Sequence, residues 1–314
     1  MINTSLSTLT NASWCAYSDE AILKGNILNH KRKAASLLLV KDSPNNKWNM
    51  FSSSLFGLSH YVSGSGFNYQ IKKFMMLGAK DPHLYKEDNL YHLLYVRHIK
   101  SYDFKTKTKD SGYRICLKSS YDLQDWSSEK VLLRSINLFG KEVKIEDPCL
   151  VKIGREYRLY FAYGEKTIYD TNKKVPQGIT YASSGSLDSS FVFSEKSILR
   201  SLPDDKYTNL GIGKFRIVQL NDGFAALNIS YYYDKEKDKS QAVIRLLSSE
   251  DGIVFKQEKV VFYKPDKGWA SYHISSIDAQ WEESEKTWYC IFTASYKKGL
   301  FSIWGTGLLL ASNR

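Results

Sequence analysis

The chain of 314 residues contains little of what marks several common protein classes. Its cysteines are few and scattered, which gives no paired metal-ligand motif and no dense disulfide framework; they are Cys15, Cys116, Cys149 and Cys290. No apolar run approaches the length of a membrane helix. Residues 1–30 show no basic start followed by an apolar stretch, so the sequence indicates no secretory signal. We therefore expect a cytoplasmic protein without a membrane span and without a predicted metal site.

Helical signals and linkers are also missing. No long window places apolar residues at i, i+3, i+4 and i+7, so few helices are expected. No Pro-rich or Gly-rich segment interrupts the chain. We therefore predict one all-β domain over residues 1–314.

The chain does contain two short phrases that repeat with one common period. The first has an acidic start, a polar turn and an aromatic strand, and it occurs at 81–85, at 146–150 and more weakly at 277–281. The second has a serine pair before an aromatic residue and an apolar strand, and it occurs at 119–122, 183–186 and 248–252. Two interleaved phrases of one period indicate a repeated supersecondary unit.

Each unit is predicted to form four short strands, and such units arranged around an axis make a β-propeller. We predict a five-bladed propeller of four-stranded antiparallel blades around a central channel, with blades at about 34–77, 80–133, 145–199, 214–262 and 275–310. The fifth unit lacks a full fourth strand, and the N-terminal segment 12–28 is expected to complete it. An irregular β-sandwich with the same number of strands is the alternative.

Acidic residues occupy the start of the innermost strand, which faces the mouth of the channel. Asp81, Asp147 and Asp278 align there, so their carboxyl groups are expected to converge from three blades. Like charges in a partly dry pocket raise one another's pKa, which lets one group act as an acid while another is ionised. Two carboxylates flanking a bond are the minimal apparatus for glycoside cleavage. The alternative is that each aspartate only caps a turn.

The two Asp-Pro phrases resemble those of the five-bladed propeller glycosidases, which include the arabinanase and xylosidase, invertase and levansucrase, and mannoside phosphorylase families. The resemblance rests on Lys80-Asp81-Pro82-His83-Leu84 and Glu146-Asp147-Pro148-Cys149-Leu150, each followed by a turn and an aromatic strand. It implies that Asp81 binds sugar hydroxyls or acts as a base. It also implies that Glu146 or Asp147 controls the acid/base step.

One of the three carboxylates in that family pattern has no counterpart in the repeat. The first-blade position aligns with Ser36, and an alternative register places Gly213 and Lys214 where blade four should supply the acid. Asp19 and Glu20, upstream of the repeat, are candidates for the missing group.

Further candidates lie where second strands end on the same face. Glu165 follows Tyr163-Gly164 and is a candidate general acid, with a loop Glu–Lys pair as the alternative. Arg97 and His98 hold the same place in blade two, where they suit a carboxylate or phosphate. The other candidate substrate-binding residues are Lys80, Tyr163, Tyr231 and His273.

The net charge of +11 concentrates partly in the loops between second and third strands. The lysines concerned are Lys100, Lys105, Lys107, Lys109, Lys166, Lys173, Lys174, Lys297 and Lys298. A mildly positive rim attracts an anionic glycan, a sugar phosphate or a nucleotide sugar. Nucleic acid is not the expected partner, because no known motif is present and the bases lie on loops.

The leading hypothesis is therefore a carbohydrate-active enzyme that acts on a glycosidic bond, in the manner of a glycoside hydrolase. A glycosyltransferase or phosphorylase with a phosphate-bearing sugar donor is the first alternative, because it fits the basic rim and the missing carboxylate. A non-catalytic glycan-binding propeller and a protein-interaction scaffold are the others. No cofactor is expected; the ring of acids leaves a channel Ca²⁺ open, but no complete ligand set is present in the sequence.

Overall fold

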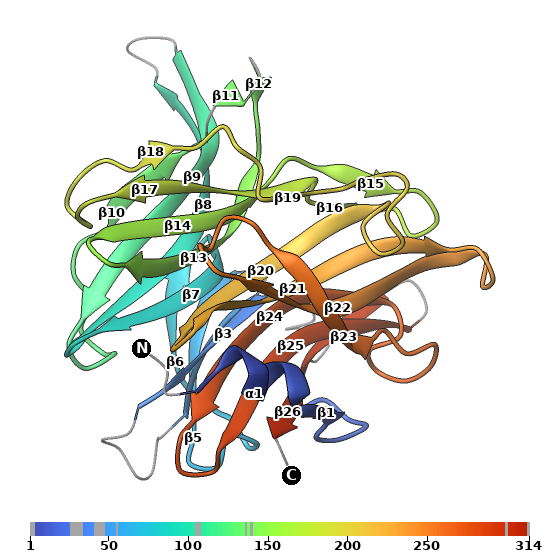
Figure 1. The fold of residues 1–314 in the computed structure, drawn as a ribbon. Coiled ribbons are helices and arrows are strands. Elements are labelled where there is room, and N and C mark those ends of the chain that lie inside the picture. The colour runs from blue at the N-terminus through green and yellow to red at the C-terminus, as the bar shows by residue number, and fades with distance from the viewer. Residues whose placement is uncertain are drawn as a thin grey trace.

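The protein is a five-bladed β-propeller, as the repeat predicts (Figure 1). The computed structural model describes residues 4–25, 34–40, 48–54, 56–103, 108–135, 137–138, 141–298 and 301–312. In this part of the chain the only helix is the short α1 (Leu6–Asn11). No helix there is long and apolar enough to cross a membrane.

Each blade is an antiparallel sheet whose strands follow one another from the axis outward. Blade one is β3 (Ala34–Leu39), β4 (Trp48–Ser53), β5 (Gly57–Ser63) and β6 (Gln70–Leu77). Blade two is β7 (Ala79–Glu87), β8 (Leu90–Asp103), β9 (Thr108–Ser120) and β10 (Lys130–Arg134). Blade three is β13 (Ile145–Ile153), β14 (Glu156–Tyr163) and β17 (Gly178–Ser184), with an outer edge split into β18 (Val192–Phe193) and β19 (Leu199–Arg200).

The last two blades begin slightly earlier than the repeat suggests. Blade four is β20 (Gly211–Leu220), β21 (Gly223–Asp234), β22 (Lys239–Ser249) and β23 (Lys256–Tyr263). Blade five is β24 (His273–Glu282), β25 (Thr287–Lys298) and β26 (Phe301–Ser312), and its outer edge is β1 (Ser13–Ala16) with β2 (Leu23–Lys24). Two small hairpins, β11 (Asn137–Leu138) with β12 (Lys141–Glu142) and β15 (Lys166–Ile168) with β16 (Lys173–Val175), lie outside the blades.

The N-terminal segment supplies the fourth strand of blade five. Ser13 in β1 pairs with Ser312 in β26, and Leu23 in β2 pairs with Thr306. Strands from the two ends of the chain therefore share one sheet, which joins the first part of the sequence to the last blade and closes the ring.

The hydrophobic core lies between blades. Five clusters of buried side chains each combine residues from two successive blades, and the cluster between blades four and five also includes Leu9 of α1. Aromatic and branched side chains fill these interfaces because they suit the half-buried face of a pleated strand. Cys116, Cys149 and Cys290 are buried in these layers as free thiols.

A polar network joins the inner strands near the axis. Asp278 in β24 accepts hydrogen bonds from the Ser36 hydroxyl (2.5 Å) and the Leu37 amide (2.9 Å) of blade one. Arg216 in β20 donates to the carbonyl oxygens of Pro148 (2.6 Å) and Pro82 (2.8 Å). All five blades thus take part in contacts of these two buried ionic side chains.

Candidate active site

A one-residue bulge shapes the start of the innermost strands. The register of β7 on β8 shifts around Asp81, and that of β13 on β14 shifts around Asp147. Both aspartates have left-handed backbone angles, with φ of 51° and 55°, a conformation that Asp adopts more readily than most residues. A bulge bends its strand and re-aims the side chain. Two equivalent carboxyl groups therefore come from neighbouring blades at the same level.

The same bulge recurs in blades four and five with different residues. In β20 the register shifts over Gly213 and Lys214, and in β24 it shifts at Ser275. Ser275, rather than Asp278, is therefore the blade-five counterpart of Asp81, and the alignment of Asp278 with the other two aspartates is corrected. Asp278 lies further along β24 in the axial network and is not among the residues that line the cavity described next.

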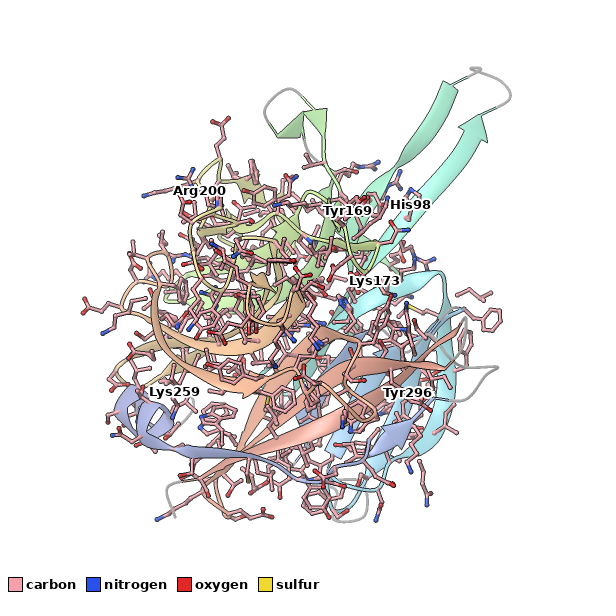
Figure 2. All side chains as sticks on the ribbon, turned by 90° about the vertical axis from the view of Figure 1, so that its right-hand side faces the viewer. His98, Tyr169, Lys173, Arg200, Lys259 and Tyr296 are labelled. Carbon is pink, nitrogen blue, oxygen red and sulfur yellow. The ribbon has the colours of Figure 1, made fainter. Side chains whose placement is uncertain are left out.

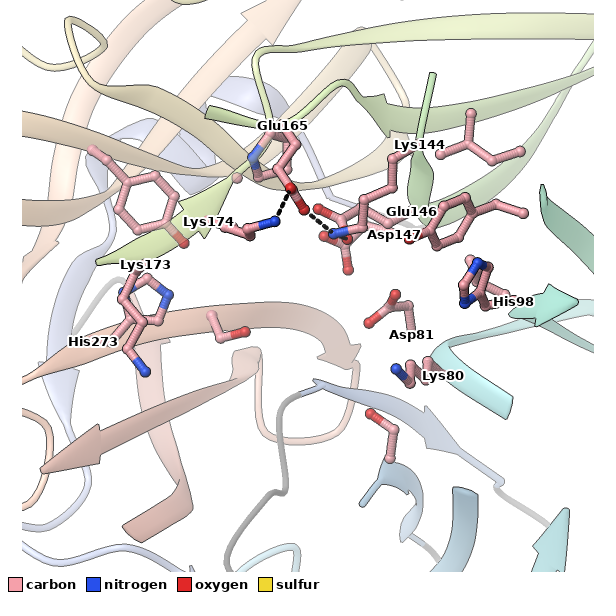
Figure 3. Close-up of a pocket in the computed structure, with 18 of the residues that line it drawn as sticks. Lys80, Asp81, His98, Lys144, Glu146, Asp147, Glu165, Lys173, Lys174 and His273 are labelled. Carbon is pink, nitrogen blue, oxygen red and sulfur yellow. Dashed lines mark hydrogen bonds and ion pairs between the residues drawn. The ribbon is translucent and has the colours of Figure 1, made fainter. Parts of the chain in front are cut away.

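The bulges open onto a cavity of about 560 Å³ (Figure 3). Four carboxyl groups line it, from Asp81, Glu146, Asp147 and Glu165. Four lysines line it as well: Lys80, Lys144, Lys173 and Lys174. In Figure 3 the Asp81 carboxyl group lies below Glu146 and Asp147, with Glu165 and Lys174 on the far side of that pair. The cavity is thus a dense field of opposite charges, of a size usual for small-ligand sites.

Asp147 is the most buried of these acids, with 8% of its surface exposed. Burial and the nearby Asp81 carboxylate raise the pKa of Asp147 above its ordinary value, while Lys214 opposes the rise. The Lys214 ammonium lies 3.5 Å from an Asp147 oxygen. Asp147 is therefore one of two carboxyl groups in the cavity, with Glu146, whose pKa is raised toward neutral pH.

Glu146 and Glu165 share a chain of ion pairs. Lys144 contacts Glu146 at 2.5 Å and Glu165 at 3.5 Å, and Lys174 contacts Glu165 at 2.5 Å. Burial raises the pKa of Glu146, against the opposing effect of Lys144. Burial also acts to raise the pKa of Glu165, but the bonds to Lys174 and Lys144 outweigh it and lower that pKa. Glu165 therefore forms the Glu–Lys pairing that the sequence left open as the alternative to a general acid, and the lysines favour its ionised form.

Blade four contributes a cation where the family pattern has an acid. Lys214 is fully buried, and its ammonium has no hydrogen-bond partner in the described structure; its nearest ionic contact is Asp147. Gly213 has no room for a side chain, because a β-carbon there would lie 2.9 Å from the Tyr231 ring. The position that lacks a carboxylate in the sequence is thus filled by close packing and by a buried positive charge.

Aromatic rings form the remaining walls. The His98 ring stacks on Tyr113 with centroids 4.5 Å apart, and both line the cavity. The Tyr231 and His273 rings stack with centroids 5.3 Å apart. The Tyr231 hydroxyl donates a hydrogen bond to the Ile274 carbonyl, so the ring is the part of Tyr231 available to contact a ligand. Trp304 stands edge-on to His273. Flat rings beside charged groups suit a ligand with apolar faces and polar edges, such as a sugar.

Two predicted substrate-binding residues face elsewhere. Arg97 donates to Glu129 at 2.6 Å and to the Leu77 carbonyl, so it braces blade two and does not line the cavity. The Tyr163 hydroxyl donates to Ser197 at 3.1 Å, outside the cavity. Arg97 lies between Val96 and His98, which line the cavity, so alternation along β8 turns its side chain away. Lys80, His98, Tyr231 and His273 do line the cavity.

Other candidates also lie apart from the cavity or outside the described structure. Asp19 and Glu20 line a second cavity and do not supply the missing carboxylate. Lys105 and Lys107 lie outside the described residues, as do the side chains of Lys100, Lys109 and Lys298.

Sequence reasoning missed Lys144 and Trp304. Lys144 lies two residues before Glu146, and this spacing puts both side chains on one face of a strand, so a signal was present. Trp304 carried no such signal, because its position depends on the pairing of β26 with β25.

The described residues contain no group of three or more His, Cys, Asp or Glu side chains placed to hold a metal ion. The channel Ca²⁺ considered from the sequence therefore has no such cluster of side chains in this part of the chain.

Comparison with known proteins gives a match in structure alone. No family profile and no curated protein sequence matches the chain. An N-acetylgalactosamine deacetylase from F. plautii, solved with blood group B trisaccharide, matches with a TM-score of 0.63 at 10% identity over 96% of each chain. A family 117 glycoside hydrolase from Zobellia galactanivorans matches with a TM-score of 0.60 at 10% identity over 97% of this chain and 92% of that one.

An exo-1,5-α-L-arabinanase from a bovine ruminal metagenomic library matches with a TM-score of 0.59 at 12% identity, over 90% of this chain and 92% of that one. Because one fold can host several chemistries, these matches establish the architecture and leave the reaction to be argued from the site. The resemblance predicted from the Asp-Pro phrases is thus confirmed at the level of the fold: the chain shares the five-bladed propeller of these carbohydrate-active enzymes.

Proposed function

We propose that the protein cleaves glycosidic bonds and that Asp81 and Asp147 are its acid/base pair. The observation that carries this proposal is the convergence of two carboxyl groups, from equivalent bulges on neighbouring blades, on one cavity. Glycoside cleavage needs a carboxyl group on each side of the scissile bond, one protonated and one ionised.

The two aspartates differ in burial, which assigns their roles. Two like charges in one pocket do not both ionise readily, so the more buried group keeps the proton. Asp147 therefore donates a proton to the leaving-group oxygen. Asp81, which is less buried, acts from the other side of the bond, as the base that activates a water or as the group that attacks the sugar carbon.

The surrounding side chains suit a sugar ring in the same cavity. The rings of Tyr113 and Tyr231 provide flat apolar walls, and Lys80 and His98 provide polar contacts at the exposed side. The trisaccharide named with the F. plautii deacetylase and the arabinan named with the ruminal enzyme support a glycan as the ligand class.

A second candidate function is phosphorolysis or glycosyl transfer from a phosphate-bearing sugar. The four lysines that line the cavity favour it. Lys144 and Lys174 are already paired with Glu146 and Glu165, and the Lys173 ammonium lies over the Tyr272 and Trp304 rings. Lys80 is therefore the lysine proposed to meet an anionic group. The third candidate is a glycan-binding protein without activity. Its affinity for the glycan would be unchanged when the proposed proton donor is replaced.

The test combines ligand binding with turnover. Wild type, Asp81→Asn and Asp147→Asn are screened by thermal shift against sugars, sugar phosphates and nucleotide sugars, and then assayed on aryl glycosides and oligosaccharides. We expect binding in all three proteins and a rate loss of about 100-fold or more in each variant, the usual cost of removing a general acid or base. Asp188→Asn is the matched control, because the Asp188 side chain is 96% exposed on blade three.

The products separate the candidate functions. Release of free sugar without phosphate supports hydrolysis, and formation of a sugar phosphate only when inorganic phosphate is added supports phosphorolysis. Binding that survives in all variants, with no turnover of any substrate, supports a glycan-binding protein. Absence of any sugar-dependent stabilisation refutes the carbohydrate proposal and leaves the interaction scaffold.

A further inference from the structure

A second cavity, of about 690 Å³, lies beside blade five. The N-terminal segment around Asp19, the loop that contains Trp269, and the paired strands β25 and β26 enclose it. Tyr296 of β25 pairs with Ile303 of β26, and both side chains line the cavity. Figure 2 shows Tyr296 on the blade-five side of the molecule, below Lys173 and His98 in that view.

Aromatic rings and charged groups line this cavity together. Three rings, those of Trp269, Tyr296 and Trp304, contribute to its wall, and Trp269 is held in place by stacking on Phe292 with ring centroids 5.4 Å apart. The polar residues of the wall are Asp19, Glu20, Lys24, Lys267, Ser271 and Lys297. Flat rings with hydrogen-bonding groups of both signs around them match a sugar, whose ring faces are apolar and whose edges are hydroxyls.

The two cavities meet at Trp304, which lines both. Its ring stands edge-on to His273 of the first cavity at 5.8 Å, and the Lys173 ammonium lies 5.8 Å from its centroid. Tyr272 lies between Lys173 of the first cavity and Lys297 of the second, at 5.0 and 4.8 Å from its ring. The two cavities therefore border the same aromatic side chain, which is 3% exposed, and a ligand that fills both would pass beside it.

We propose that the second cavity is a distal sugar subsite and that the natural ligand is an oligosaccharide or the end of a polysaccharide chain. One sugar unit occupies the acid-lined cavity, and a following unit packs against Tyr296 and Trp269. Asp19 and Glu20 accept hydrogen bonds from its hydroxyl groups. This inference rests on the proposed function, because it assigns the first cavity to a sugar.

The experiment measures affinity against chain length. Arabino-, xylo-, manno- and galacto-oligosaccharides of one to five units are titrated by calorimetry into the full chain carrying Asp147→Asn, which is expected to slow turnover by about 100-fold or more. Variants in that background are Tyr296→Ala, Tyr296→Phe and the pair Asp19→Asn with Glu20→Gln. Tyr121→Ala is the control, because Tyr121 is 78% exposed and follows β9 in blade two, outside both cavities.

We expect at least one series to bind more tightly as units are added. Tyr296→Ala should remove about tenfold of that gain, as expected for one lost aromatic contact, while Tyr296→Phe retains it. The double variant Asp19→Asn with Glu20→Gln should lower the affinity for longer ligands more than the affinity for the monosaccharide. Because both residues lie outside the hydrophobic core, this variant tests the subsite even if Tyr296→Ala fails to fold.

The two proposals fail differently. Equal affinity for one unit and for several, or an equal effect of Tyr296→Ala on both, refutes the distal subsite and leaves the proposed function standing. Failure of every saccharide to bind refutes both.

Discussion

Lys214 shows how much one buried side chain can decide in this protein. Taking an ammonium group out of water is costly unless a charge or hydrogen bond compensates it. Lys214 is fully buried with no hydrogen-bond partner in the described structure, and burial lowers its pKa. Its nearest compensation is Asp147 at 3.5 Å. The pair is thus electrostatically coupled: the lysine limits the rise in the pKa of Asp147 that burial and Asp81 cause.

Lys214→Met should therefore shift the pH profile of the proposed activity. The proposed function requires protonated Asp147, so the rate is expected to fall as pH rises through the raised pKa of Asp147. Removing the positive charge raises that pKa further, and the basic limb of kcat/KM should move to higher pH. Because methionine fills a similar volume but leaves the buried Asp147 carboxyl group without its nearest cation, the free energy of unfolding should fall, by about 3 kcal/mol or less since Asp147 can take up a proton.

The measurement is the pH dependence of kcat/KM on an aryl glycoside, together with urea unfolding. Lys130→Met serves as the control, since Lys130 pairs with the exposed Asp188 away from the cavity. A basic limb that stays in place, or moves to lower pH, would contradict the proposed link between Lys214 and Asp147.

At the scale of the element, the bulge at the start of four inner strands is the feature that builds the site. The same irregularity presents Asp81, Asp147, Gly213 and Ser275 from four blades. The Asp-Pro dipeptide suits it because Asp accepts a left-handed angle and proline forms no ladder hydrogen bond. The repeat therefore keeps one backbone feature in four blades, with aspartate in blades two and three and other residues in blades four and five.

The N-terminal elements are a second feature at this scale. They lie at the start of the chain, but they pack against its last two blades and complete blade five. Leu9 of α1 is 2% exposed and packs in the cluster between blades four and five. The Lys259 ammonium donates to the carbonyl oxygens of Thr10 and Ala12 at 2.5 and 2.7 Å, which fixes the end of α1 beside β1.

Leu9→Ala should thus destabilise the whole molecule by about 2–4 kcal/mol, as for other buried leucines. Urea unfolding followed by tryptophan fluorescence measures this, and the exposed neighbour Ser7→Ala should cost less than about 0.5 kcal/mol. A loss for Leu9→Ala as small as that for Ser7→Ala would show that α1 is not part of the cooperative core.

At the scale of the whole molecule, the blades are held together by shared apolar layers and by the axial network. Every hydrophobic cluster belongs to two blades, so no blade buries its core alone. Arg216 is 2% exposed and reaches blades two and three through Pro82 and Pro148, while its Nε lies 3.6 Å from Asp278 of blade five. The floor beneath the candidate active site is therefore also the junction of the ring.

Arg216→Met should lower the free energy of unfolding by about 3–5 kcal/mol, because it leaves Asp278 as a buried charge without its partner. Equilibrium unfolding in urea measures the loss, and Arg200→Met, at an exposed position on β19, is the control. If Arg216→Met and Arg200→Met unfold at the same denaturant concentration, the axial network does not hold the ring together.

The sequence alone was enough to predict the five-bladed fold and the convergence of Asp81 with Asp147. Both predictions depend on patterns among residues that are close in the sequence. One pattern is a repeat of strands with turns between them, and the other is an Asp-Pro dipeptide at a fixed place in that repeat. Side chains that depend on strand alternation alone, such as those of Lys80 and His98, were also assigned to the correct cavity.

Only the tertiary structure decided what surrounds those acids. The displacement of Asp278 from the site depends on where the bulge falls in the register of β24, and the position of Asp19 and Glu20 depends on the path of the N-terminal segment around blade five. The coupling of Lys214 to Asp147 joins two blades, and Trp304 joins two cavities. Contacts of this kind link residues far apart in the chain, and burial and distance, which set their energies, exist only once the ring has closed.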